Sequence, residues 1–130
     1  VITHRTAIVS MLKDAGINCS PYWYDEYWFA KIVTKFSDLT NQYTDYVIYG
    51  AGEHTLMLSK TQGLGKGLKC IADKNHKYWG KTVEGVPCIA PNEILTHSHN
   101  VIISSQYYEK EISQYLIELF GDDINILTLY

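Results

Sequence analysis

The sequence predicts an α/β domain in which strands and helices alternate around a parallel sheet. Short runs of β-branched and aromatic residues recur between residues 46 and 130, and segments with helical periodicity separate them. The run at residues 100–104 is almost continuously apolar, as expected for a parallel strand that helices cover on both faces. The run at residues 46–49 leads into a Gly-x-Gly turn and then into a helical pattern.

Two helices are expected before the first strand. Apolar residues at near-helical spacing indicate a helix over residues 4–15. Ser20 and Pro21 suit the N-cap and the first turn of a second helix, which we expect over residues 22–39. Six aromatic residues crowd the start of that second helix and cover more than one of its faces. They either pack on the sheet or contact another domain or subunit.

Five strands are expected after these helices, at residues 46–49, 68–72, 86–89, 100–104 and 124–127. Helices are expected at residues 53–62 and 107–120, with one or two helical turns at residues 91–95. Right-handed crossovers then give a three-layer α/β/α domain with a five-stranded parallel sheet in the order 3-2-1-4-5. We therefore divide the chain into an N-terminal helical segment, residues 1–45, and the α/β domain, residues 46–130. The segment would pack on the core or on a domain outside this sequence.

The turn after the first strand is expected to hold a phosphate. Gly50 and Gly52 allow a tight turn, and the N–H groups at the start of the next helix would face the anion. Asp73 follows Gly50 by 23 positions and ends the second strand, which suits an acid that reaches ribose hydroxyls. Thr55 replaces the third glycine of the dinucleotide fingerprint, which leaves a mononucleotide or a nucleotide-sugar open. The alternative is a turn that only closes the strand–helix corner.

Other polar residues are expected at the same edge of the sheet, because the crossover direction reverses there between the first and fourth strands. The helix dipole favours Glu53 at the helix start without any ligand, and His54 could donate to a phosphate or cap the turn. Ser104 and Ser105 would bind ligand polar groups or cap the following helix. The predicted ligand-binding residues are Gly50, Gly52, Glu53, His54, Thr55, Asp73, Lys74, Ser104, Ser105 and Gln106.

The sequence reveals no catalytic set. His54 has no recognisable partner for general-base chemistry. His97 and His99 lack a third ligand at suitable spacing, so we expect no metal site. A self-contained NAD-dependent enzyme would need a Tyr–Lys or Cys–His set, and Tyr107 and Lys110 are three positions apart rather than four.

The composition limits the kinds of partner and the cellular compartment that we expect. The net charge of −3 and the pI near 5.9 argue against a nucleic-acid surface, because no basic stripe is present. No apolar run approaches the roughly 18 residues of a membrane helix, and no signal peptide is recognised. The three cysteines fit reduced thiols, which predicts a cytoplasmic protein. The chain begins at Val1, already in a helical pattern, so we expect a piece of a larger protein.

Residues 46–130 resemble the small Rossmann-like domains of bacterial surface-sugar biosynthesis. The similar stretches are YVIYGAGEHT, CIADKNHKYWGKTVEGVPCIAPNEI, NVIISSQYYEKEI and INILTLY. The resemblance is closest to the N-terminal nucleotide-sugar-binding domains of sugar acyltransferases, and related domains bind NAD, CoA or nucleotide-sugars. It implies that Gly50, Gly52, His54 and Asp73 hold the nucleotide. It also implies a structural role for Gly85, Pro87, Pro91, Glu93 and Ile94.

Three functions are consistent with the sequence. The leading hypothesis is a nucleotide- or nucleotide-sugar-binding module of a larger protein of surface-polysaccharide biosynthesis. The second is an NAD-binding oxidoreductase domain. The third is a structural or docking domain that uses the aromatic helix 22–39, with Trp23 and Trp28 contacting another domain or a second copy of the chain. The expected ligand is a small nucleotide, either a nucleotide-sugar or NAD.

Overall fold

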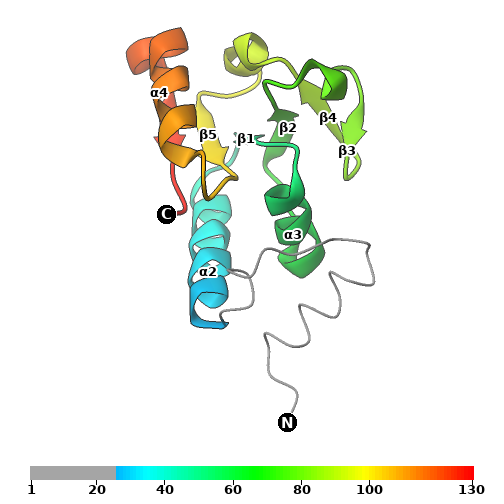
Figure 1. Ribbon diagram of the computed structural model, residues 1–130, viewed down its shortest axis with the longest axis vertical. Helices are drawn as coiled ribbons and strands as arrows, with labels where there is room; N and C mark the ends of the chain where they lie inside the picture. Colours follow the sequence, from blue (N-terminus) through cyan, green and yellow to red (C-terminus); the bar gives the residue numbers. More distant parts are fainter. Residues whose placement is uncertain (1–25) are drawn as a thin grey trace.

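The computed structural model describes the backbone of residues 26–130 and the side chains of residues 29–130. Helices and strands alternate along this part of the chain, and the strands form one six-stranded sheet in the order β3-β4-β2-β1-β5-β6 (Figure 1). The elements are α2 (Glu26–Gln42), β1 (Tyr46–Tyr49), α3 (Glu53–Gln62), β2 (Leu68–Ala72), η2 (His76–Tyr78), β3 (Thr82–Val83), β4 (Val86–Ile89), η3 (Pro91–Thr96), β5 (Asn100–Ile103), α4 (Glu109–Phe120), η4 (Gly121–Asp123) and β6 (Asn125–Leu127).

The sheet differs from the predicted one by a strand. The five predicted strands are present as β1, β2, β4, β5 and β6. Neighbouring strands among them pair in parallel, and their order in the sheet, β4-β2-β1-β5-β6, is the predicted order 3-2-1-4-5. The prediction of a purely five-stranded parallel sheet is wrong. A sixth strand, β3, pairs antiparallel with β4, so β3 rather than β4 forms this edge of the sheet. Glu84 and Gly85, with φ of 51° and 76°, make the hairpin turn between them. A strand of two residues has no periodicity that a sequence could show.

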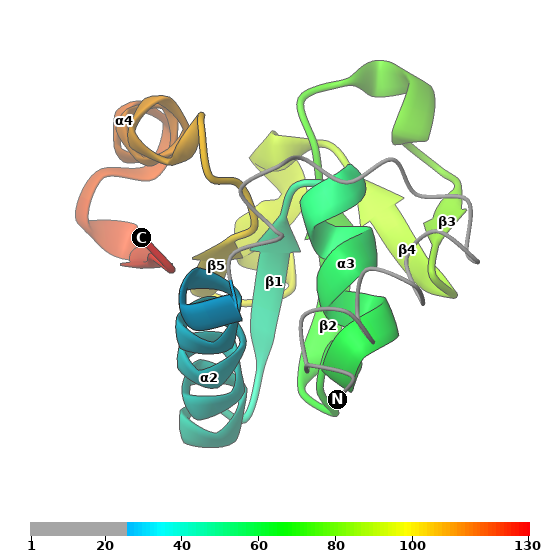
Figure 2. The ribbon, with the colours of Figure 1, turned by 60° about the horizontal axis from the view of Figure 1, so that its bottom comes forward.

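Helices α2 and α3 cover one face of the sheet, and α4 covers the other together with the short helix η3 (Figure 2). Alternate β1 residues point to opposite faces, as the pleat requires. Tyr46 and Ile48 pack with residues of α2 and α3, whereas Val47 and Tyr49 pack with residues of η3 and α4. The domain therefore has the three-layer α/β/α arrangement that the sequence predicts. All four β1 residues are buried, which places this strand in the centre of the core.

Helix α2 belongs to the same core as the sheet. Phe29, Ile32 and Phe36 recur at helical spacing and are buried against β1 and α3. The predicted helix 4–15 and Trp23 lie outside the described residues, as does the side chain of Trp28. The division of the chain at residue 45 stays a prediction. Within the described part of the chain, the structure has no helix that is long and apolar enough to cross a membrane.

Candidate functional site

The turn between β1 and α3 requires a glycine at its first position. Gly50 has a φ of +123°, a conformation that side-chain-bearing residues rarely adopt. A Cβ atom at this position would lie 2.8 Å from the carbonyl oxygen of Ser104. The backbone N–H of Gly50 donates to the carbonyl of Ala72 at 2.8 Å, so the turn is also fixed to the end of β2. The chain thus brings the ends of β1, β2 and β5 together.

The second glycine of the turn leaves the start of α3 open. Gly52 is the N-cap residue and is exposed to solvent. Among the described residues, no side chain makes a capping hydrogen bond to the start of α3. The first N–H groups of a helix have no partner within the helix, and the helix dipole is positive at that end. Glu53 is exposed in the first turn and offsets part of this positive potential. The geometry can accept an anionic group, with Glu53 limiting the charge that is favourable.

Asp73 holds the turn from the side. Its Oδ2 accepts a hydrogen bond from the backbone N–H of Ala51 at 2.8 Å, and its Oδ1 accepts one from the backbone N–H of Asn75 at 2.8 Å. Each carboxylate oxygen has two acceptor positions, so both can still accept a hydroxyl donor. Asp73 therefore positions the glycine turn and also offers acceptors at the end of β2.

A chain of polar side chains lies beneath the turn. His54 is only 7% exposed, its Nδ1 lies 2.7 Å from Ser104 Oγ, and its Nε2 lies 2.7 Å from Tyr130 Oη. Thr55 is fully buried, and its hydroxyl contacts both the carbonyl oxygen of Gly50 and Ser104 Oγ. These contacts connect the last residue of the sequence to the first glycine of the turn.

One arrangement of protons satisfies this whole chain of contacts. Gly50 offers a carbonyl, which can only accept, so the Thr55 hydroxyl must donate to it. Ser104 then donates to Thr55, and His54 Nδ1–H donates to Ser104. The Nε2 atom of His54 is left as an acceptor for the hydroxyl of Tyr130. We assign the Nδ1–H tautomer to His54 on these grounds.

Burial keeps His54 uncharged. Desolvation lowers the pKa of His54 from 6.5 to about 4, because the buried ring cannot hold a charge away from water. The imidazole is therefore neutral at neutral pH, and Ser104 and Tyr130 occupy its nitrogens. His54 positions the turn in this arrangement.

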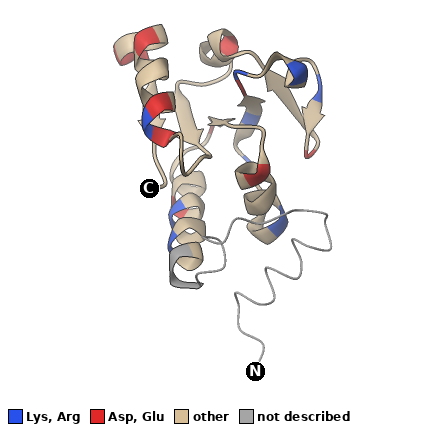
Figure 3. Cartoon of the chain, in the orientation of Figure 1, with Lys and Arg blue, Asp and Glu red and all other residues tan. Residues whose placement is uncertain are grey.

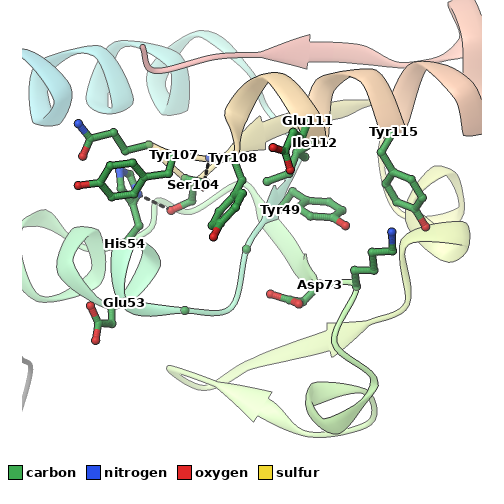
Figure 4. Close-up of a pocket in the computed structure, with 15 residues that line it drawn as sticks. Tyr49, Glu53, His54, Asp73, Ser104, Tyr107, Tyr108, Glu111, Ile112 and Tyr115 are labelled. Carbon is green, nitrogen blue, oxygen red and sulfur yellow. Dashed lines mark hydrogen bonds between the residues drawn. The ribbon is translucent and has the colours of Figure 1, made fainter. Parts of the chain in front are cut away.

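A pocket of about 550 Å³ opens beside the turn, at the carboxyl ends of β1, β2 and β5 (Figure 4). All the predicted ligand-binding residues line it except Thr55, whose hydroxyl faces the turn from beneath. The predicted location at the reversal of crossover direction therefore coincides with a real cavity. Pockets of this size hold ligands of nucleotide dimensions. Ligand binding by these residues stays a prediction.

Helix α4 supplies a wall of the pocket that the sequence analysis missed. Tyr108, the N-cap residue, and Glu111, Ile112 and Tyr115, which share one face of the helix, all line the cavity, as do Tyr49 and Tyr107. Burial, together with the neighbouring Tyr115 and Asp73, raises the pKa of Tyr49, which stays a neutral hydroxyl. The spacing of tyrosines on helix 107–120 next to the predicted reversal point was the signal that could have identified this wall.

The charges around the pocket are mostly negative. Its lining contains three carboxylates, from Glu53, Asp73 and Glu111, and Lys74 is its one cation among the described residues. Figure 3 shows acidic residues at the start of α3 and along α4, the two helices that contribute Glu53 and Glu111 to the lining. The Nζ atom of Lys74 lies 4.6 Å from the centre of the Tyr115 ring. The net negative charge of the lining therefore limits the number of phosphate groups that a ligand can place here.

No protein-family model matches the chain, and no curated protein matches it. Among solved structures, UDP-D-quinovosamine 4-dehydrogenase from Vibrio fischeri is similar, with 26% identity and a TM-score of 0.49 over 65% of this chain and 76% of that chain. RSP, a Rex-family repressor, has 13% identity and a TM-score of 0.45, over 95% of this chain and 74% of that one. RSP in complex with β-NAD+ and operator DNA has 14% identity and a TM-score of 0.44, over 93% and 73%. We assign the fold as Rossmann-like from the sheet order and the glycine turn.

Proposed function

We propose that this domain binds a nucleotide or a nucleotide-sugar in the pocket beside the glycine turn. The observation that carries the proposal is the bond from Ala51 N–H to Asp73 Oδ2, at 2.8 Å. It places a carboxylate at the end of β2 against the turn that opens α3, at the edge of a cavity of about 550 Å³. An acid in this position suits ribose hydroxyls, and the open start of α3 suits a phosphate.

NAD is the second candidate for the same site. The arrangement of Gly50, Gly52 and Asp73 suits the adenosine half of NAD as well as it suits another nucleotide. The charge of Asp73 disfavours a 2′-phosphate, so we expect NAD to bind better than NADP. The surface-polysaccharide context, including any transferase partner domain, rests on the sequence resemblance. The docking role of helix 22–39 also stays a proposal, as does the absence of nucleic-acid binding.

Thermal unfolding with a panel of compounds tests the proposal. The panel contains NAD, NADP, CoA, UDP-GlcNAc, CDP, dTDP-glucose and GDP-mannose. A ligand at 100 times its dissociation constant stabilises a protein by about 2.7 kcal/mol, which raises the midpoint of a domain of this size by several degrees. Such a shift with at least one nucleotide is the expected result. A folded protein with no shift for any compound would contradict the proposal.

The same measurement on Asp73→Ala locates the ligand. We expect the variant to lose the ligand-induced shift, because it loses both the ribose acceptors and the bond that holds Ala51. The ligand-free midpoint of the variant must be measured too, because the turn loses a contact. Asp122→Ala is the matched control, since Asp122 is an exposed acid that does not line the pocket. A shift retained in Asp73→Ala would place the ligand elsewhere.

A further inference from the structure

The pocket has two chemically different ends. At the end of β2, Asp73 and Lys74 both line the cavity, and the Lys74 ammonium lies 4.6 Å from the centre of the Tyr115 ring, so this end offers a carboxylate and an ammonium. Figure 4 shows Asp73 and Tyr115 in the lining. Beyond the turn, the lining comes from the segment after β5 and the first turns of α4. Its residues there include Gln106, Tyr108 and Glu111. We call this second part the α4 subsite.

The α4 subsite offers acceptors and an aromatic face. Tyr108 is the N-cap residue of α4 and Glu111 lies in its first turn, and both line the pocket. The Tyr108 side chain is 61% exposed, and its ring is available to cover an apolar surface of a ligand. When ionised, the Glu111 carboxylate accepts hydrogen bonds and donates none.

Gln106, a further residue of this lining, carries an unsatisfied polar atom. The Oε1 atom of Gln106 is buried and has no hydrogen-bond partner among the described residues. Buried polar atoms in native proteins are almost always paired, so an unpaired one that lines a pocket indicates a missing donor.

The charge of this subsite excludes a further phosphate. Lys74, the one cation that lines the pocket among the described residues, lies against Tyr115, while Glu53 and Glu111 bring negative charge to the turn and the α4 subsite. A group that fits here carries hydrogen-bond donors, has an apolar face for Tyr108 and bears no negative charge. A pyranose ring meets all three conditions, because its hydroxyls donate and its C–H face stacks on aromatic rings.

We propose that the α4 subsite, formed by Gln106, Tyr108 and Glu111, binds the glycosyl group of a nucleotide-sugar. This inference rests on the proposed function, because the nucleotide part must occupy the turn and Asp73. The sugar lies across Tyr108, and its hydroxyls donate to the Glu111 carboxylate and to Gln106 Oε1. The subsite makes the chain select sugar-bearing nucleotides over the corresponding diphosphates.

Titration calorimetry with matched ligand pairs tests this assignment. The pairs are UDP with UDP-glucose, dTDP with dTDP-glucose and GDP with GDP-mannose, and ADP-ribose is compared with NAD. For the pair that binds, we expect the nucleotide-sugar to bind about tenfold more tightly than its diphosphate, as hydrogen bonds to a charged group predict.

Variants of the subsite separate the sugar from the nucleotide. Glu111→Gln and Tyr108→Ala should each weaken the nucleotide-sugar by about tenfold. The diphosphate should be unaffected by Tyr108→Ala and should bind slightly better to Glu111→Gln, because a repelling charge is removed. Glu118→Gln is the matched control, since it makes the same change on an exposed residue of the same helix outside the pocket. Unchanged ligand-free midpoints show that the variants fold.

The outcomes distinguish this inference from the proposed function. If no nucleotide binds, both fail. If diphosphates bind but their sugars add no affinity, the nucleotide site stands and the glycosyl subsite is overturned. If NAD binds more tightly than ADP-ribose and Glu111→Gln removes that difference, the subsite holds a cationic ring and the proposal is likewise overturned.

Discussion

Polar clusters lie at both ends of the parallel strands, and they differ in what they leave open. At the amino ends, Ser98 donates to the Asp45 carboxylate and accepts from the Asn100 N–H. Asn100 also donates to the Asp45 carbonyl at 3.1 Å and accepts from Asn125 at 3.0 Å. The hydrogen bonds of this cluster join its own members, and none of these residues lines the pocket. At the carboxyl ends, the His54 network supports a turn beside an open cavity.

The comparison shows that polar residues at strand ends do not by themselves indicate a binding site. Both clusters join neighbouring strands through side-chain hydrogen bonds. In the part of the chain that the structure describes, only the carboxyl end combines a glycine with a positive φ, an uncapped helix start and a pocket. The amino-end cluster should therefore contribute stability, whereas the carboxyl-end residues should contribute stability and ligand binding together.

The largest expected effect is that of Gly50→Ala. The new methyl group would meet the Ser104 carbonyl at 2.8 Å in an unfavourable backbone conformation, so we expect a loss of about 4 kcal/mol in the free energy of unfolding. Ligand binding should be lost as well. Gly52→Ala is the control, because a Cβ there meets nothing within 4 Å and should cost only about 1 kcal/mol. Chemical denaturation measures both, and equal losses in the two variants would contradict the described turn.

The next effect is a pH dependence of stability that His54 causes. Its pKa is about 4 in the folded protein and 6.5 when exposed, so the unfolded chain binds the proton more readily. The contribution of the neutral, buried His54 to the free energy of unfolding is fully present above pH 6.5. It is lost as the pH falls from 6.5 toward 4, because the unfolded chain then gains a proton that the folded protein does not bind. It amounts to about 3 kcal/mol.

Denaturation curves between pH 4 and 7 can isolate this contribution. The wild type should lose more stability than His54→Gln over that interval. His97→Gln is the control, since His97 is exposed and lies outside the pocket. Parallel curves for wild type and His54→Gln would show that His54 is not buried as described.

Disruption of the amino-end cluster should affect stability alone. Asp45→Ala removes the acceptor of the buried Ser98 hydroxyl, so we expect a loss of about 2 kcal/mol. The dissociation constant of any ligand that the thermal panel identifies should stay within about twofold, because Asp45 lies at the opposite end of the strands. Calorimetry on the folded variant decides this, and a large loss of affinity would remove the contrast between the two clusters.

The smallest effect is expected at the surface ion pair of Lys60 and Glu84. Their charged atoms lie 3.7 Å apart, and the Lys60 side chain is 40% exposed. Solvent screens such a pair, so Lys60→Ala should change the free energy of unfolding by less than about 0.5 kcal/mol. This variant sets the background against which the other losses are judged. A loss above 1 kcal/mol would indicate that the β3–β4 hairpin is held mainly through α3.

The sequence predicts the strands of this fold well because each carries an apolar run next to a glycine or polar turn. Helix α3 begins at Glu53, as its pattern predicts, whereas α4 begins at Glu109 rather than at residue 107. The antiparallel β3 was missed because two residues show no alternation. A pairing that depends on a neighbouring strand is a tertiary property and leaves no local trace.

The site was predicted on one side only. Residues after β1, β2 and β5 follow from parallel topology, because the carboxyl ends of such strands share an edge. Tyr108 and Glu111 belong to a helix whose rotation about its own axis is set by packing on the sheet, which spacing alone does not determine. The sequence predicts Thr55 as a ligand-binding residue, but it does not line the pocket. Its side chain is buried beneath the turn, where its hydroxyl donates to the Gly50 carbonyl, and residue spacing does not reveal this orientation.

The short strands at the two margins of the sheet have a consequence for self-association. β3 contains two residues and β6 contains three, so each margin presents little unpaired backbone to another chain. Long, flat margins are the sites at which sheets add foreign strands and aggregate. A second copy of this chain would therefore attach through side-chain surfaces rather than by extending the sheet.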